Sequence, residues 1–235
     1  MPVGLVSDLG MQMLDALQAL HDQGWVHRDV KPSNFCLAVG DDTAILAQCA
    51  TDCSADAASA HRGGLENAAA GIGSPSCFLI DFGLARRWRQ ADGRAKPARK
   101  TAEFRGTCKY ASIRSHEAQD LGRADDLWSL LYLLSELAQG DLPWASNRDR
   151  DAVLAQKRKH LRDILEFLAL QGDGALDQKI SSPTPTSPPV LKRDRPLDGC
   201  RQIPLAPAPR PLCRMFAALS RLSFDATPDY TAFRV

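Results

Sequence analysis

Near the start of the chain, apolar residues recur at steps of three and four, the period of an amphipathic helix. The stripe consists of Val6, Leu9, Met13, Leu17 and Leu20. It predicts a helix over residues 6–23 that buries one face. Ser7 or Asp8 could cap its start, and Gly24 could end it.

A second segment, residues 127–137, contains only three polar positions. A helix that is apolar nearly all round is buried on every side, so this segment predicts the central helix of the fold, ended near Gly140. Amphipathic helices are also expected at residues 149–170 and 212–222. A further helix could start near Thr227, with Pro228 in its first turn.

Two short strands are predicted, Phe35–Ala38 and Cys77–Ile80, as the arms of a hairpin. Between them, residues 39–76 show no sustained period, which predicts an insertion that is mostly disordered or a weak helix. The proline content of residues 171–211 predicts a second disordered insertion. The chain is therefore expected to be α+β and mainly helical.

Composition excludes few functions. The 235-residue chain has a formal net charge of +1, so the charge balance favours neither nucleic acid nor an acidic membrane as a partner. Charges interrupt every apolar run and the opening residues lack a signal-peptide pattern, so no membrane span is expected. The seven cysteines lack paired metal-ligand spacing, which favours free thiols and a cytoplasmic or nuclear location.

The polar stretch after the first helix carries the residue types that phosphoryl transfer needs. Asp29 can receive the proton of an attacking hydroxyl, Lys31 can offset the transferred charge, and Asn34 can offer an oxygen to magnesium. Pro32 stiffens this loop. Asp81, followed by Phe and Gly directly after the second strand, is a further candidate magnesium ligand.

These motifs resemble a known family. His-Arg-Asp at the start of the 27–34 loop and Asp-Phe-Gly at 81–83 resemble the catalytic loop and the magnesium-binding motif of protein kinases. Residues 103–113, with Tyr-Ala-Ser-Ile near their end, resemble the substrate-positioning loop of the casein kinase I superfamily. Residues 122–129 and 140–144 look most like its tau-tubulin kinase branch.

The resemblance implies a serine/threonine kinase that transfers the γ-phosphoryl group of magnesium-ATP to hydroxyls of protein substrates. Asp29 would act as base and Lys31 would approach the γ-phosphate. Asn34 and Asp81 would bind magnesium, and Cys36 would lie at the floor of the adenine pocket.

The resemblance also implies two supporting contacts. Thr107 would bond within the catalytic loop, and Asp126 would hold the loop backbone around His27 and Arg28. Arg114 departs from the pattern, because the family usually has Asn at this position.

The implied fold is a protein-kinase-like large lobe, with residues 1–235 as one incomplete domain. The glycine-rich loop, strand lysine and helix glutamate of a small lobe cannot be placed. The chain alone is therefore expected to be weakly active or inactive, with apolar surface exposed around Phe82. The alternative function is a non-catalytic, pseudokinase-like scaffold that binds other proteins.

Residues 86–100, the basic segment, contain seven Lys or Arg residues and one acid, Asp92. Two interpretations are open. The segment could be a solvated loop, or it could act with Arg105 and Lys109 to attract acidic or already phosphorylated protein substrates.

Overall fold

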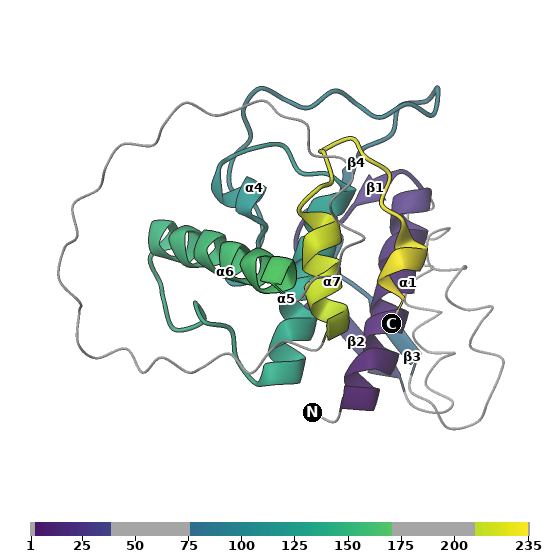
Figure 1. Ribbon diagram of the computed structural model, residues 1–235. Coiled ribbons are helices and arrows are strands. Elements are labelled where there is room, and N and C mark those ends of the chain that lie inside the picture. Colours follow the sequence, from purple (N-terminus) through teal and green to yellow (C-terminus); the bar gives the residue numbers. More distant parts are fainter. Residues whose placement is uncertain (1–2, 39–75, 171–209, 235) are drawn as a thin grey trace.

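The computed structural model describes residues 3–38, 76–170 and 210–234, which form a mainly helical body with short strands (Figure 1). The α-helices are α1 (Val3–Asp22), α4 (Ile113–His116), α5 (Arg123–Gln139), α6 (Arg150–Leu170) and α7 (Arg210–Leu219). The strands are β1 (Trp25–Val26), β2 (Phe35–Ala38), β3 (Ser76–Leu79) and β4 (Arg86–Arg87). Two 3-10 turns, η1 (Pro32–Asn34) and η4 (Tyr230–Phe233), complete the described elements. The fold is α+β, as expected.

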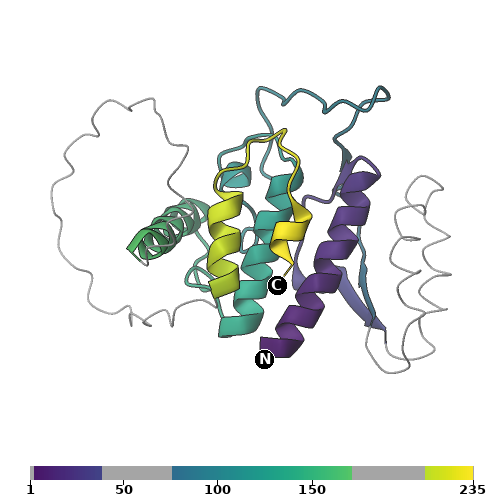
Figure 2. The same ribbon diagram turned by 45° about the vertical axis from the view of Figure 1, so that its right-hand side comes forward.

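Helix α5 forms the centre of the core. It packs against α1 and against α7, and Figure 2 shows the three helices side by side. Leu127, Leu130 and Leu131 have no exposed surface, which confirms that this helix is buried all round. Gly140 ends it with a φ of 93°, a left-handed conformation that costs glycine little.

Helix α1 buries the predicted stripe, since all five of its apolar residues are at most 7% exposed. Its start differs from the prediction. The helix begins at Val3, so Ser7 and Asp8 lie inside it and do not cap it. The apolar stripe located the buried face correctly but not the start of the helix, which lies before the first buried residue, Val6.

Between α5, α6 and α7 lies a cluster of rings in edge-to-face contact. The Trp144 ring lies 5.1 Å from that of Tyr132 and 5.5 Å from that of His160, and His160 lies 5.5 Å from Phe216. Such arrangements add about 0.5–1.5 kcal/mol per pair beyond area burial. The predicted apolar side of α6 is only partly buried, because Leu165 remains 36% exposed.

The two predicted strands pair as an antiparallel hairpin, with Phe35 opposite Leu79 and Ala38 opposite Ser76. Ser76 therefore belongs to β3 and not to the first insertion. Arg210 and Pro211 likewise belong to α7 and not to the second. The remaining residues of both predicted insertions, 39–75 and 171–209, lie outside the described residues.

The last turn also differs from the prediction. Instead of a helix with Pro228 in its first turn, the chain forms η4, capped by Asp229, whose carboxylate accepts from the amides of Thr231 and Ala232. Pro228 lies before this cap, because the Asp229 side chain competes successfully for the free amides. Among the described helices, none is both long and apolar enough to cross a membrane.

Replacing the buried Leu131 should test the central role of α5. Leu131→Ala would leave a cavity among side chains with no exposed surface and should lower the free energy of unfolding by about 2–5 kcal/mol. Urea unfolding followed by circular dichroism measures this change. The control Leu165→Ala, at a 36% exposed position, should change it by under about 0.5 kcal/mol. Equal losses in the two variants would contradict the packing described.

Candidate active site

One buried carboxylate holds the start of the 27–34 loop. The two oxygens of Asp126, in the first turn of α5, accept from the backbone amides of His27 and Arg28, each at 2.7 Å. His21 Nε2 lies 2.8 Å from the same carboxylate, and His21 Nδ1 lies 2.6 Å from the Tyr230 hydroxyl. Burial alone would raise the pKa of Asp126, but the bonds from His21 and the Arg28 amide outweigh burial and lower it. Asp126 thus makes the backbone contacts that the resemblance implied.

The 103–113 loop lies directly on this loop. A Cβ atom at Gly106 would approach the Arg28 carbonyl oxygen to 2.6 Å, and Gly106 has a φ of 89°. Any other residue would clash with backbone and adopt a strained conformation. Arg28 itself has a φ of 70°, so both partners of this close approach have left-handed backbone.

Asp29 is held by side chains from both loops. Its Oδ1 accepts from the Thr107 hydroxyl at 2.9 Å, as the resemblance implied, and its Oδ2 accepts from Lys31 Nζ at 2.6 Å. The side chain of Asp29 is 10% exposed, and that of Lys31 is 24% exposed. The carboxylate is therefore fixed in orientation and keeps a small exposed surface.

Asn34 connects the 27–34 loop to the strand before Asp81. Its side-chain Nδ2 donates to the backbone carbonyl of Asp29 at 2.9 Å, and its backbone carbonyl accepts from the Ile80 amide at 2.9 Å. Asp81 follows with a φ of 62°, and its carboxylate accepts from the Gly83 amide at 3.2 Å. Phe82, around which exposed apolar surface is expected, is itself partly buried, with its ring 5.5 Å from that of His27.

The donor types of Asn34 and Asp81 fit a magnesium ion. The side-chain nitrogen of Asn34 bonds to the loop, so its side-chain oxygen can serve as a metal ligand. The exposed Asp81 offers a carboxylate as a second ligand. Magnesium prefers such oxygens and takes few of them from the protein. The described residues contain no group of three or more His, Cys, Asp or Glu that could hold a metal. Cys36 lies in β2, half-buried opposite Phe78, and its role at an adenine pocket stays a prediction.

The end of the 103–113 loop is fixed to α5 and to the residues after it. The Tyr110 hydroxyl donates to Glu136 at 2.6 Å, and Lys109 forms an ion pair with the same carboxylate. Trp144 Nε1 donates to the Lys109 carbonyl at 2.8 Å. Lys109, which the sequence grouped with Arg105 as an attractor of substrates, is therefore engaged within the protein.

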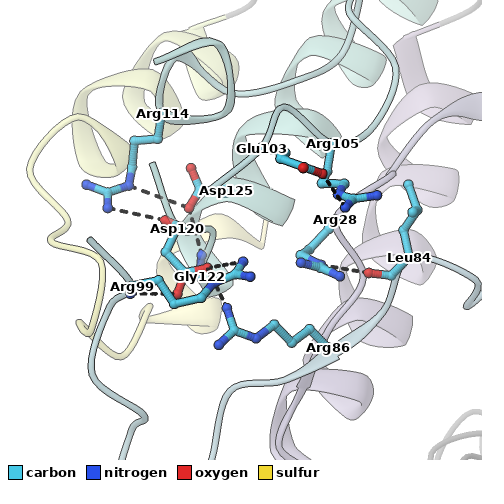
Figure 3. A network of polar contacts seen from close by, with 10 residues as sticks. All are labelled: Arg28, Leu84, Arg86, Arg99, Glu103, Arg105, Arg114, Asp120, Gly122 and Asp125. Carbon is cyan, nitrogen blue, oxygen red and sulfur yellow. Dashed lines mark hydrogen bonds and ion pairs between the residues drawn. The ribbon is translucent and has the colours of Figure 1, made fainter. Parts of the chain in front are cut away.

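Arginines of the basic segment converge on Asp120 (Figure 3). Arg86 donates to Asp120 Oδ1 at 2.6 Å, and Arg99 donates to it through its guanidinium at 2.8 Å and to Oδ2 through its amide at 3.0 Å. Burial alone would raise the pKa of Asp120, but the bonds from Arg99 and Arg86 lower it to about 2. Burial, together with the charges of Arg86, Arg99 and Arg105, lowers the pKa of Arg28, so positive charge is concentrated here.

The sequence did not identify Asp120 as an anchor, because a single acid in a loop gives no sign of its distant partners. Arg114, the departure from the family pattern, also packs in this region. It donates to the Asp120 carbonyl at 3.3 Å, lies 3.8 Å from the Asp125 carboxylate and covers the Phe224 ring at 5.4 Å. Arg114 is therefore held by the loop before α5, by the first turn of α5 and by Phe224.

Comparison with known proteins agrees with this arrangement. Residues 3–188 match the protein kinase domain, and the chain belongs to the protein kinase family. Within the family it belongs to the casein kinase I group.

Two relatives illustrate the similarity. A Dictyostelium discoideum protein named as a probable serine/threonine-protein kinase is 43% identical over 158 residues, which cover 67% of this chain and 26% of the relative. A rice protein named casein kinase 1-like protein HD16 is 32% identical over 162 residues, 68% of this chain and 19% of the relative. The chain thus spans only a minor part of the length of either relative.

Removing the charge at Asp120 should release the basic segment. Asp120→Asn should lower the free energy of unfolding by about 1–3 kcal/mol and speed trypsin cleavage after Arg94 and Arg99, because two charge-assisted partners are lost. The control Asp92→Asn, whose side chain is 54% exposed in the same segment, should change neither quantity.

The same pair of variants gives a pH test. The folded pKa of Asp120 lies near 2, below its ordinary value of 3.8, so its stabilisation is present above about pH 4 and is lost as pH falls toward 2. The stability difference between wild type and Asp120→Asn should shrink over that range. A difference that is constant down to pH 2 would show that the charge of Asp120 does not stabilise the fold.

Proposed function

We propose that this chain carries the catalytic centre of a serine/threonine protein kinase that transfers the γ-phosphoryl group of magnesium-ATP to Ser or Thr hydroxyls of proteins. The observation that carries the proposal is the bonding around Asp29. One carboxylate oxygen accepts from Thr107 and the other from Lys31, while Asn34 bonds to the Asp29 carbonyl. This arrangement fixes a base, a cation and an oxygen donor within one short loop.

The proposed roles follow from what each group can do. Asp29 orients the acceptor hydroxyl and receives its proton, and Lys31 offsets negative charge on the transferred group. Asn34 and Asp81 hold magnesium, which when bound neutralises charge on the phosphates. Cys36 contacts the adenine base. Since the reaction depends on positioning and electrostatics, holding Asp29 from two sides supports this chemistry directly.

The described residues contain no glycine-rich loop and no strand lysine that could cover the phosphates. Phosphate binding by this chain would rest on Lys31, Asn34 and Asp81, so weak activity is expected of the chain alone. The alternative is a non-catalytic scaffold.

We further propose that acidic or phosphorylated proteins are the substrates. Arg99 pairs with Asp120 and Arg105 pairs with Glu103, but their side chains remain 46% and 47% exposed. Both border an open hollow of about 460 Å³ together with Thr101 and Ala102. Guanidinium groups favour carboxylates and phosphates through paired hydrogen bonds. The nearby charges of Arg28 and Arg86 reinforce this preference. A cytoplasmic or nuclear location would suit such substrates.

Two carboxylate variants should separate catalysis from cofactor binding. Asp29→Asn should abolish phosphoryl transfer to a serine peptide while leaving magnesium-dependent ATP binding within about twofold, because Asp29 acts on the hydroxyl. Asp81→Asn should weaken that binding by about tenfold or more, because a magnesium ligand loses its charge. Calorimetry with and without magnesium, beside a radiolabelled phosphate assay, measures both. ATP binding that is absent from the wild-type chain or indifferent to magnesium would favour the scaffold.

Removing exposed arginine charge should weaken binding of acidic peptides. The variant Arg105→Gln should raise the Kd of a fluorescent phosphoserine peptide by about tenfold and leave a neutral peptide unaffected. Fluorescence anisotropy measures both dissociation constants. Arg94→Gln, at an 85% exposed side chain of the same segment, serves as control and should have little effect. Equal weakening by the control would indicate a nonspecific charge effect.

A further inference from the structure

Helix α6 contributes a lysine to the interior of the protein. Lys157 is 1% exposed, and its Nζ donates to the carbonyl oxygens of Cys108 at 2.8 Å and Ala111 at 2.5 Å. The same nitrogen lies 3.3 Å from Nε2 of the buried His116. Lysine is almost never fully buried without partners, so these contacts require an explanation.

The surroundings of Lys157 are matched to an ammonium group. An ammonium has three N–H donors, and two carbonyl oxygens and one imidazole nitrogen face it. Burial and the charge of Lys157 lower the pKa of His116 to about 4, so near neutral pH His116 has a ring nitrogen that can accept. The rings of Tyr132 and Trp144 lie 4.9 and 5.4 Å from Nζ, close enough for cation–π attraction.

Holding this side chain inside carries a cost. Burial lowers the pKa of Lys157 to about 7, well below the usual value of 10.5. Among the described residues, the charged partner expected of a buried lysine is replaced by backbone carbonyls of one short turn. A buried lysine bonded to both sides of a turn suggests a specific role for that turn.

The turn in question leads to Asp29. The amides of Tyr110 and Ala111 both donate to the Thr107 carbonyl at 2.9 Å, and the Thr107 hydroxyl donates to Asp29. Lys157 bonds to Cys108 and Ala111, on either side of the residues that α5 holds through Glu136. Two helices therefore fix the same turn, and its first residue contacts the candidate base.

We propose that Lys157 is a positioning residue, whose ammonium holds the 107–111 turn in the shape that sets the Thr107 hydroxyl on Asp29. Lys157 acts through the turn and contacts none of the candidate magnesium ligands. Its link to catalysis rests on the function proposed above, whereas its hold on the turn does not.

Amide hydrogen exchange of the full chain, followed by NMR, tests the hold on the turn. Lys157→Met keeps the length and apolar stem but removes all three donors. The amides of Tyr110 and Ala111 should then exchange about tenfold faster or more, the effect of losing hydrogen bonds that support a local structure. The amides of Leu130 and Leu131 should be unchanged, which shows that the core remains folded.

Lys159→Met is the matched control, two residues along α6 with a side chain 71% exposed, and it should exchange as wild type. Wild-type exchange of Tyr110 and Ala111 in Lys157→Met would overturn the proposal. If that variant fails to fold, the wild-type chain still decides through the ¹⁵Nζ signal of Lys157. Its ammonium protons should exchange far more slowly than those of Lys159, and equal exchange would overturn the proposal.

Kinetics test the link to Asp29 separately. Lys157→Met should lower the kcat of peptide phosphorylation by about tenfold or more with the KM for magnesium-ATP unchanged, because only the positioning of the base is lost. A raised KM for ATP at unchanged kcat would overturn the link to Asp29. A wild-type chain that shows no magnesium-dependent ATP binding, yet shows the expected exchange, would count against the proposed function and support the hold of Lys157 on the turn.

Discussion

The arrangement around the candidate active site depends on one buried carboxylate. Asp126 accepts two backbone amides from the 27–34 loop, so a residue of the central helix fixes a loop almost a hundred positions earlier in the chain. A carboxylate that is buried and accepts several hydrogen bonds is held in one orientation and remains charged. The packed core around α5 thereby restrains the backbone that carries Asp29. Without this anchor, the side chains of the 27–34 loop would not be held in fixed positions relative to one another.

Other contacts connect the 27–34 loop to the 103–113 loop and to the basic segment. The approach of Gly106 to the Arg28 carbonyl brings the 103–113 loop onto the 27–34 loop. Asp120 accepts hydrogen bonds from Arg86 and Arg99, whose charges lie near Arg28. Backbone contact sets the distance between the loops, and charge pairing sets the course of the basic segment over them. The result is a surface on which positive charge lies beside the candidate base.

The sequence predicted those parts of the fold that have a local pattern. The stripe of α1 and the apolar run of α5 gave the correct buried faces, because periodicity reflects which side of a helix meets the core. The motif spacing indicated that Asp29, Lys31 and Asn34 share one loop, and in the structure hydrogen bonds connect them.

The missed features depend on contacts that are distant in sequence. Asp120 gave no sign of its arginine partners, and α1 includes Ser7 and Asp8, which the sequence offered as caps. Lys157 did carry a signal, since it lies four residues after Val153 and four before Leu161, on the apolar side of α6. A charged residue on such a stripe indicates either a mistaken face or a buried partner, and only the three-dimensional structure identifies the partner as a turn of backbone.

The contact between His21 and Tyr230 has a wider consequence. Tyr230 reaches His21 from 209 positions away, and His21 bonds in turn to Asp126. The final turn of the chain is thus connected through a relay of three side chains to the loop that carries Asp29. The minimal folding unit must therefore extend past α7 to include η4, and a fragment trimmed before Tyr230 would leave a buried imidazole with half of its hydrogen bonds.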